Sequence, residues 1–459
     1  MNGGGGRGGG PASPRWRIVI LGAGGRDFHN FNAVYRDDPG VEVVAFGATQ
    51  IPGIAGRTYP ASLAGPLYPD GIPILEEDAL PAYCREYGVE EVVFAYSDVT
   101  HETVMHLASR FLAAGCDFSL LGPAATMIAA SKPVIAVTAV RTGCGKSPVS
   151  RHIAARLAAR GLRAAVLRHP MPYGDLARQD VQRFASFADL DAAACTIEER
   201  EEYEPYVAAN AVIYAGVDYA RILARAEAEA DIVLWDGGNN DFPFIRPDLH
   251  VTLTDALRPG DEIRYHPGET VLRMADVVII SKVAGAAAGA VEGIGQAIRA
   301  ANPGADILHG DLEVTLSDAP AVRGRRVLVV EDGPTITHGG MAYGAGYVAA
   351  TAAGAAEIVD PRPYAAPEIA KTYARYSHIG PVLPAVGYYA AQLDGLAATI
   401  AAAKPDVVVV ATPIRLERLI VIDRPVIHAT YAYTDRDQPG LDGVIDAFCA
   451  RVKSDGGRR

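Results

Sequence analysis

The sequence contains no run of the roughly 20 continuous apolar residues that a membrane-spanning helix needs, and its glycine-rich start lacks the apolar core of a secretory signal. It also lacks an excess of basic residues, because its net charge is −12, which argues against nonspecific binding to nucleic acid or to an anionic membrane. These absences predict a cytoplasmic protein with neither nucleic acid nor membrane as a partner. Its five cysteines show no C-x-x-C spacing and are expected to be free thiols: Cys84, Cys116, Cys144, Cys195 and Cys449.

A phosphate-binding loop is the strongest motif that is present. The apolar strand expected at residues 134–138 runs into R-T-G-C-G-K-S, and a helical segment follows. In this order, backbone N–H groups can surround a phosphate while the helix N-terminus adds partial positive charge. We expect Lys146 to neutralise the β and γ phosphates of a nucleotide and Ser147 to place its hydroxyl on Mg²⁺. The residues expected to contact the nucleotide in this loop are Gly143, Cys144, Gly145, Lys146 and Ser147.

The loop departs from the general pattern, which has a glycine where Val140 stands. The run at residues 141–147 resembles the variant loop of the dethiobiotin-synthetase and MinD class of P-loop proteins, whose motif opens with a basic residue. This resemblance implies that Arg141 replaces the signature lysine of that class, which reaches phosphates within its own site or across a dimer. We expect a homodimer, with the choice between these two roles of Arg141 left open.

A second nucleotide-binding signal is an apolar strand, D-I-V-L-W, that ends in D-G-G-N-N-D. A carboxylate at the tip of such a strand, beside a phosphate loop, is the Walker B arrangement and binds Mg²⁺ directly or through water. We assign this role to Asp236, so that Ser147 and Asp236 form the predicted metal site. Asn239, Asn240 and Asp241 are expected to orient the attacking group.

Basic and aromatic residues follow the strand expected at residues 163–167. The prolines and glycine of H-P-M-P-Y-G keep this segment out of a helix, so Arg168, His169 and Tyr173 should lie at the same sheet edge as the phosphates. Such side chains suit an anionic substrate.

A later strand ends in S-K-V-A, and the residues after it indicate which nucleotide base is bound. GTP-binding relatives have an aspartate at the position of Ala284, and that aspartate pairs with guanine. Its absence favours ATP over GTP, with Lys282 stacking its aliphatic stem on the base.

Four further segments each have two interpretations. The acidic run at residues 196–204 is expected to be a solvated helix face, with a cation site as the alternative. Asp98 either caps a helix or binds a ligand. The loop at residues 331–341, which contains His338, is assigned to the active site rather than to a structural role. Arg415 is either a surface arginine or a phosphate ligand.

The turn G-A-G-G-R-D near the N-terminus resembles the first strand-to-helix turn of a Rossmann-like unit, in which glycines allow a phosphate to approach closely. The match is incomplete because Asp27 stands at the third glycine position, and the next strand ends without an acidic residue for a ribose. NAD is therefore not the favoured cofactor, although a dinucleotide-binding module stays open as an alternative function.

Alternating strands and helices over 459 residues predict an α/β protein. We expect a Rossmann-like domain with a parallel sheet, followed by a larger P-loop NTPase domain with a mostly parallel sheet. The expected boundaries are a disordered tail at residues 1–14, the two domains at 15–125 and 130–450, and a loose tail at 451–459.

Six segments together resemble the cyclic 2,3-diphosphoglycerate synthetase family: GAGGRDFHNF, AVRTGCGKS, LRHPMPYGDL, TIEEREEYE, WDGGNND and EDGPTITHGGM. The resemblance covers residues 17 to about 450. It implies a ligase that uses ATP and Mg²⁺ to close 2,3-diphosphoglycerate into a cyclic phosphoanhydride, releasing ADP and phosphate. The catalytic residues implied are Lys146, Arg141 and Asp236 for the nucleotide, and Arg168 and His169 for the phosphorylated substrate, with the loops of Arg26 and His338 as further candidates.

Two other functions are compatible with the same motifs. One is a related ATP-dependent kinase or ligase acting on another phosphorylated or carboxylated small metabolite. The other is a nucleotide-switch GTPase or metallochaperone-like protein, because the variant loop also occurs there.

Overall fold

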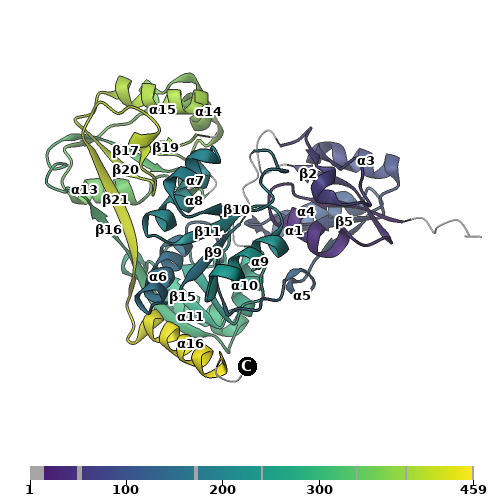
Figure 1. The fold of residues 1–459 in the computed structure, drawn as a ribbon. Helices are drawn as coiled ribbons and strands as arrows, with labels where there is room; N and C mark the ends of the chain where they lie inside the picture. The colour runs from purple at the N-terminus through teal and green to yellow at the C-terminus, as the bar shows by residue number, and fades with distance from the viewer. Residues whose placement is uncertain are drawn as a thin grey trace, which may run out of the picture. The chain divides into compact units, whose positions relative to one another are not determined.

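The computed structural model describes residues 15–48, 54–169, 174–238, 241–337, 339–387 and 390–456. The chain divides into two compact units, drawn in Figure 1. Unit 1 comprises Met1–Tyr96, Glu102–Met127 and Gly174–Asp180, and unit 2 comprises Ser97–His101, Ile128–Tyr173 and Val181–Arg459. None of the helices in the described part of the chain is long and apolar enough to cross a membrane.

Unit 1 contains a six-stranded sheet in the order β3-β4-β2-β1-β5-β7, in which only the pairing of β3 with β4 is antiparallel. Its strands are β1 (Trp16–Leu21), β2 (Val41–Ala48), β3 (Thr58–Tyr59), β4 (Ile72–Glu76), β5 (Glu91–Phe94) and β7 (Asp117–Leu120). Its helical segments are α1 (Arg26–Asn30), η1 (Phe31–Tyr35), α2 (Ala61–Ala64), η2 (Glu77–Ala79), α3 (Leu80–Tyr87), α4 (His101–Leu112) and α5 (Pro123–Thr126). The central strand β1 is fully buried over its last four residues, as expected for a parallel strand covered on both faces.

Unit 2 is built on a 13-stranded sheet whose first part carries the phosphate loop. The order in this part is β10-β11-β9-β12-β8-β13-β15-β16. The strands are β8 (Val134–Ala139), β9 (Ala164–Arg168), β10 (Gln182–Phe184), β11 (Val212–Ala215), β12 (Ile232–Asp236), β13 (Leu249–Asp255), β15 (Val277–Ser281) and β16 (Asp306–Leu316). Every residue of β8, β12, β13 and β15 is buried.

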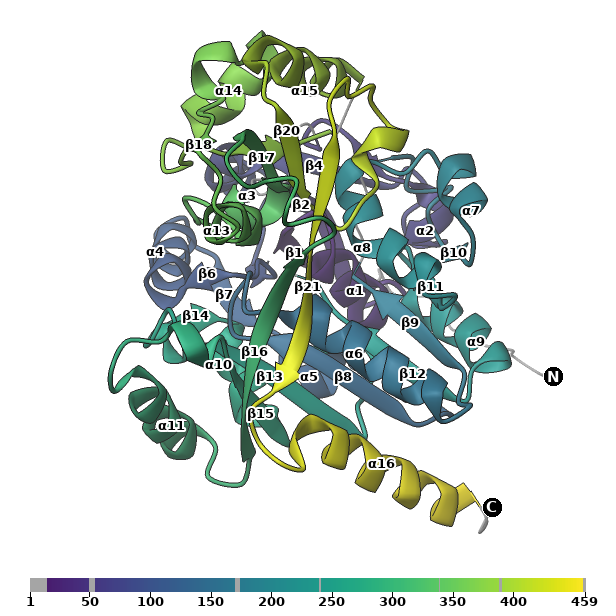
Figure 2. The same cartoon turned by 90° about the vertical axis from the view of Figure 1, so that its left-hand side faces the viewer.

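Two long strands connect this part of the sheet to the C-terminal part. Figure 2 shows β16 and β21 (Val426–Asp435) running side by side, and they pair antiparallel from Gly310–Asp435 to Leu316–Ala429. The sheet continues through β20 (Val407–Ala411) and β17 (Arg326–Asp332) to β18 (Glu357–Ile358), while β19 (Leu383–Ala385) also pairs with β17. The prediction of an α/β fold with mostly parallel sheets is confirmed, and the late strands extend the same sheet.

The remaining elements of unit 2 connect and cover these strands. Its helices are α6 (Lys146–Ala159), α7 (Phe187–Ala192), α8 (Ile197–Ala208), α9 (Tyr219–Glu229), α10 (Gly268–Met274), α11 (Ala290–Ala301), α12 (Gly333–Ile336), α13 (Ala345–Ala352), α14 (Pro367–Arg375), α15 (Ala390–Ala403) and α16 (Gly440–Gly456). Single turns of 3₁₀-helix are η3 (Asp261–Ile263), η4 (Val283–Gly285), η5 (Arg362–Tyr364) and η6 (Leu416–Arg418). A short antiparallel pair, β6 (Val99–Thr100) with β14 (Tyr265–His266), completes the unit.

A buried polar cluster lies between β8 and β13. Thr138 Oγ1 is 2.9 Å from His250 Nε2 and 2.8 Å from Thr252 Oγ1, so the polar side chains of these strands bind one another inside the core. Burial lowers the pKa of His250 from 6.5 to about 4. The histidine is therefore neutral in the folded protein at neutral pH.

This cluster predicts acid sensitivity. Between pH 6.5 and 4 the unfolded chain protonates His250 and the folded protein does not, so stability is present above pH 6.5 and falls as pH drops towards 4. The shift corresponds to about 3 kcal/mol of unfolding free energy. We expect urea unfolding at stepped pH to show a smaller loss over this interval for His250→Gln than for the wild type. The control is His106→Gln, whose side chain is exposed. Equal slopes for wild type and His250→Gln would contradict this prediction.

Candidate active site

The phosphate loop joins β8 to α6 through two glycines in the left-handed region. Gly143 has φ +86° and Gly145 has φ +100°, conformations that residues with a side chain rarely adopt. A Cβ atom on Gly145 would also lie only 3.0 Å from a methyl carbon of Leu312. Both glycines are therefore required by the backbone, and Lys146 begins the helix directly after them.

Two cations hold the loop from one side. Lys282 Nζ donates to the carbonyl oxygen of Gly143 at 2.7 Å, and Arg258 Nη2 donates to that of Thr142 at 2.7 Å. Both cations pair with Asp255, at 2.7 and 3.0 Å. The loop conformation is thus fixed by the protein itself. Lys282, predicted to stack on a base, has its ammonium group on the loop backbone.

Cys144 lies within this loop and is buried. Burial raises the pKa of its thiol to about 11, so it is protonated at neutral pH. A protonated, buried thiol is a poor nucleophile, which agrees with a loop-filling role.

Arg141 is anchored by a cluster of its own. Its guanidinium pairs with Asp98 at 3.2 Å and with Asp261 at 3.1 Å, and its Cζ lies 3.9 Å from the ring centroid of Tyr265. Arg141 still lines the cavity described below. Asp98, for which sequence left open helix capping or ligand binding, is thereby a partner of Arg141.

Lys146 and Asp236 meet directly. Asp236 ends β12, the neighbour of β8 in the sheet, and its Oδ1 accepts from Lys146 Nζ at 2.6 Å and from Ser150 Oγ at 2.9 Å. Its Oδ2 accepts from the hydroxyl of Tyr206 at 2.8 Å. Complete burial alone would raise the pKa of Asp236, but Lys146 and then Arg168 overcome this effect and hold it well below its usual range.

Arg168 continues this row of alternating charges. Its Nη1 lies 3.2 Å from Asp236 Oδ1, and its Nη2 lies 2.5 Å from Glu202 Oε1. The row therefore runs Lys146, Asp236, Arg168, Glu202, and connects the phosphate loop to helix α8. Arg168 is buried, and its positive charge is neutralised by two carboxylates. It is therefore poorly suited to bind a polyanionic substrate.

His169 follows Arg168 and pairs with Asp241, Nδ1 to Oδ2 at 2.9 Å. Both side chains are buried. The neighbouring predicted residues Tyr173, Asn239 and Asn240, and His338 of the later loop, lie outside the described residues.

The acidic run on α8 is buried, so the prediction of a solvated helix face was wrong. Glu198, Glu199, Arg200, Glu201 and Glu204 are all at most 5% exposed. The physical reason is that each of three carboxylates has a specific polar partner. Glu199 caps the helix on Thr196 N at 2.8 Å, Glu201 accepts from Thr412 Oγ1 at 2.7 Å, and Glu204 pairs with Arg200 at 3.0 Å. The T-x-x-E capping box was the available signal.

A cavity of about 1190 Å³ extends from the phosphate loop to the C-terminal part of the sheet, entirely within unit 2. The loop end is lined by Arg141, Lys146, Ser147 and Lys282. The other end is lined by Arg151, Arg168, Glu201, Glu202, Glu331, Asp332, Thr335 and Tyr431. Six carboxylate residues therefore line the same cavity as the phosphate loop: Glu201, Glu202, Asp311, Glu313, Glu331 and Asp332. The sequence motifs assigned this set only in part to the site.

The lining residues fit a magnesium ion carried by a nucleotide, because Mg²⁺ takes oxygen ligands and leaves several positions to water and phosphate. The Ser147 hydroxyl lines the cavity beside the loop. Asp236, the other predicted ligand, accepts from Lys146, Ser150 and Tyr206 in this structure. It would contact a metal only through water or after releasing Lys146.

The glycine turn of unit 1 is filled by its own side chain. Asp27 Oδ1 accepts from the backbone N–H groups of Gly24, Gly25 and Phe28 at 2.9, 3.0 and 2.7 Å. A Cβ atom on Gly22 would lie 2.5 Å from Asp27 Oδ2. Backbone N–H groups that could receive a pyrophosphate are thus occupied by a carboxylate, which disfavours a dinucleotide at this turn.

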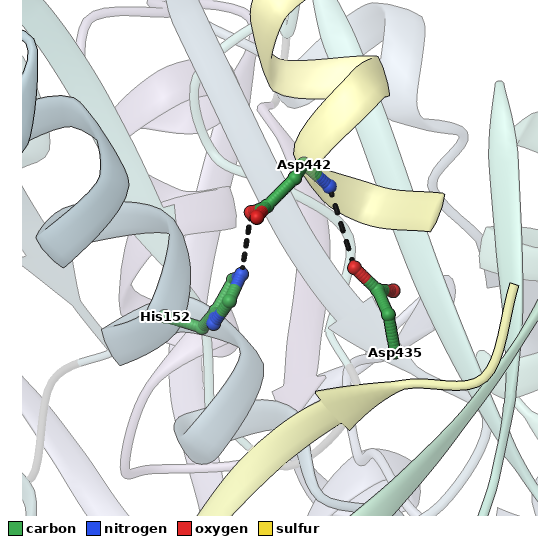
Figure 3. A group of neighbouring side chains, drawn as sticks. All are labelled: His152, Asp435 and Asp442. Atoms are coloured by element: carbon green, nitrogen blue, oxygen red, sulfur yellow. Dashed lines mark hydrogen bonds and ion pairs between the residues drawn. The ribbon is translucent and has the colours of Figure 1, made fainter. Parts of the chain in front are cut away.

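A separate group of possible metal ligands, shown in Figure 3, comes from three elements: His152 from α6, Asp435 from β21 and Asp442 from α16. Asp442 Oδ1 is 2.9 Å from His152 Nε2 and 2.8 Å from Arg156 Nε. Asp435 accepts from the backbone N–H of Leu441 at 2.9 Å and from the Tyr433 hydroxyl at 2.6 Å. Arg156 also pairs with Asp442, so the cluster is a set of ion pairs and hydrogen bonds that holds the start of α16 against α6.

The chain resembles several known proteins. It is 55% identical over 440 residues to the arginine synthetase ArcE of Thermococcus kodakarensis, covering 95% of this chain and 98% of that protein. It is 29% identical over 96 residues to the cyclic 2,3-diphosphoglycerate synthetase of Pyrococcus furiosus, 21% of each chain. A structure of LpxK from Aquifex aeolicus in complex with ATP aligns with a TM-score of 0.44 at 12% identity, covering 81% of this chain and 99% of that one. No protein-family model matches the sequence.

Proposed function

The chain belongs to the family of the arginine synthetase ArcE, an ATP-dependent ligase as predicted, and we propose that it forms the guanidinium group of arginine. The proposed precursor is citrulline, whose ureido group carries an oxygen where arginine carries a nitrogen. This precursor falls within the carboxylated metabolites that sequence analysis kept as an alternative to 2,3-diphosphoglycerate.

The exchange of oxygen for nitrogen explains the need for ATP. A ureido oxygen is a poor leaving group, so the γ-phosphoryl group is first transferred to it. Ammonia then attacks the ureido carbon, the new C–N bond forms, and the C–O bond breaks with its electron pair leaving on inorganic phosphate. Catalysis then rests on positioning and charge stabilisation.

The acidic end of the cavity is the single observation that carries this proposal. Four carboxylates, Glu201, Glu202, Glu331 and Asp332, line it against two arginines, Arg151 and Arg168, and Arg168 is already paired with two carboxylates. A cationic product such as arginine is attracted to this lining. The several negative charges of 2,3-diphosphoglycerate are repelled by it.

The residues around the phosphate loop have separate roles in this scheme. Lys146 neutralises the phosphoryl group during transfer, and Asp236 and Arg168 hold the lysine and the sheet edge in place. Ser147, with Asp236 acting through water, would hold Mg²⁺, which supplies charge neutralisation for the phosphates. Arg141, fixed by Asp98 and Asp261, lines the nucleotide side of the cavity.

Closure of 2,3-diphosphoglycerate is the second candidate. It is supported by the 96-residue similarity to the Pyrococcus furiosus enzyme, and it shares the first step, phosphorylation of a substrate oxygen. The two reactions differ in the group that expels phosphate, which is ammonia in one and a neighbouring phosphate in the other.

The proposal is tested by measuring ADP release with ATP and Mg²⁺ in the presence of citrulline and ammonium. We expect turnover that needs both compounds, with arginine identified by mass spectrometry. Parallel reactions omit one compound, replace both with 2,3-diphosphoglycerate, or replace ATP with GTP. ADP release that depends on 2,3-diphosphoglycerate and ignores citrulline would overturn the proposal in favour of the second candidate.

A further inference from the structure

We propose that Glu201 and Asp332 form the site that binds ammonium and takes a proton from it, an inference that rests on the proposed function. Glu201 lies on α8 and Asp332 ends β17. Both line the cavity that contains the phosphate loop. The two carboxylates therefore come from separate parts of unit 2 and meet at the same space.

The surroundings of Glu201 indicate a missing cationic partner. Its side chain is 4% exposed, and Oε1 accepts from Thr412 Oγ1 at 2.7 Å. Its Oε2 is buried, and no hydrogen-bond donor among the described residues reaches it. Asp332 lines the same cavity, and its charge acts on the Glu201 carboxyl group. Two facing carboxylates are compatible only with a proton or a cation between them.

Among the described residues, no cation forms an ion pair with Glu201 or Asp332. Arg151 lines the same end of the cavity, and its Cζ lies over the ring of Tyr431, 5.9 Å from the centroid. Asp332 Oδ2 accepts from the backbone N–H of Thr335 at 3.1 Å, which is a neutral donor. Glu198 and Glu202 place further negative charge near Glu201. The hydroxyl of Tyr431 also lies near the negative charges of Glu201 and Glu202. The guanidinium of Arg168 pairs with Glu202 and Asp236. The site therefore attracts a small cation that can donate several hydrogen bonds.

The charge state of the pair matches a proton acceptor. Burial, and then the neighbouring Asp332, raises the pKa of Glu201 well above its usual value, and burial raises the pKa of Asp332. A carboxylate with a raised pKa is a stronger base than one in water. The shared-proton arrangement is then the state that the pair reaches after ammonium has given up its proton.

Ammonium binds between the two carboxylates as the proton that they share leaves to solvent. One N–H proton then passes from the bound ammonium to the pair, which leaves neutral ammonia. The ammonia lone pair attacks the phosphorylated ureido carbon, forming the C–N bond and releasing phosphate. The row of Glu202, Arg168, Asp236 and Lys146 joins this site to the phosphate loop, so phosphoryl transfer and ammonia attack take place in one cavity.

The test compares wild type with Glu201→Gln and Asp332→Asn, two substitutions that keep side-chain size and remove the charge. We expect the KM for ammonium to rise about 10-fold or more and the KM for ATP to change little, because only the ammonium site loses a charged acceptor. The rate of the variants should recover as pH rises and free ammonia becomes abundant. Glu292→Gln, an exposed residue outside the cavity, is the control.

A second measurement does not depend on turnover. Infrared difference spectra should show the band of a protonated carboxyl group disappearing when ammonium chloride is added to the wild type, and no such loss in Glu201→Gln. An unchanged KM for ammonium in both variants, or an infrared band that ammonium does not affect, would overturn the inference. If the wild type shows no citrulline-dependent turnover but the band responds, the proposed reaction fails and the cation site stands.

Discussion

Replacing Lys146 with methionine is expected to lower kcat/KM for ATP by about 10³-fold, the scale found when a charged group that stabilises a transition state is removed. Methionine keeps much of the length of lysine and loses only the ammonium group. Folding should be retained, because Asp236 keeps Arg168, Ser150 and Tyr206 as partners. The measurement is steady-state ADP release at varied ATP, together with thermal unfolding.

The matched control is Lys371→Met, since the side chain of Lys371 is exposed and pairs with Glu368 on its own helix. It should leave both rate and stability unchanged. A Lys146→Met protein with wild-type kcat/KM would show that the loop does not hold the transferred phosphoryl group, and the nucleotide site would have to lie elsewhere.

Replacing Arg168 with methionine should affect both stability and activity. The substitution leaves Asp236 and Glu202 without the guanidinium between them, and removing one partner of a buried ion pair costs about 3–5 kcal/mol. The unfolding midpoint in urea should fall accordingly. Citrulline-dependent turnover should be lost even well below the unfolding transition, because Lys146 and Glu202 are no longer held in one row.

The same strand provides the control. Arg163 precedes β9 at its opposite end and pairs with Asp231 at the surface, and solvent screening leaves such surface pairs with little effect on stability. Arg163→Met should therefore cost little. If the two variants lose equal stability, the row from Lys146 to Glu202 is not the buried network that we describe.

The parts of the site that were predicted from the sequence are those in which a few consecutive residues determine the local backbone structure. An apolar strand, two glycines and a lysine at a helix start have few other uses, so the loop from Gly143 to Lys146 was recognisable. An apolar strand ending in Asp236 was recognisable for the same reason. The structure brings these two segments together, although they are far apart in the chain.

The rest depended on contacts that sequence patterns do not contain. A run of glutamates usually means solvent, and only the tertiary partners Thr412, Arg200 and Arg168 show why the run on α8 is buried. Strand β13 was missed because its alternating polar residues are typical of a half-exposed strand, whereas here they bind each other between two buried strands. Two segments belong to a different unit from the residues on either side of them: Ser97–His101 lies in unit 2 and Gly174–Asp180 in unit 1. A prediction that divides the chain into consecutive domains cannot place such segments.

The aspartate in the glycine turn of unit 1 has a consequence for how such turns are interpreted. Asp27 is covalently attached to the loop that it satisfies, so any free phosphate would compete with an anion at a very high effective concentration. The turn thus stabilises its own backbone by mimicking the ligand that related architectures recruit from solution. A glycine turn between a strand and a helix can in this way be stabilised by a single side chain, with no phosphate bound to it.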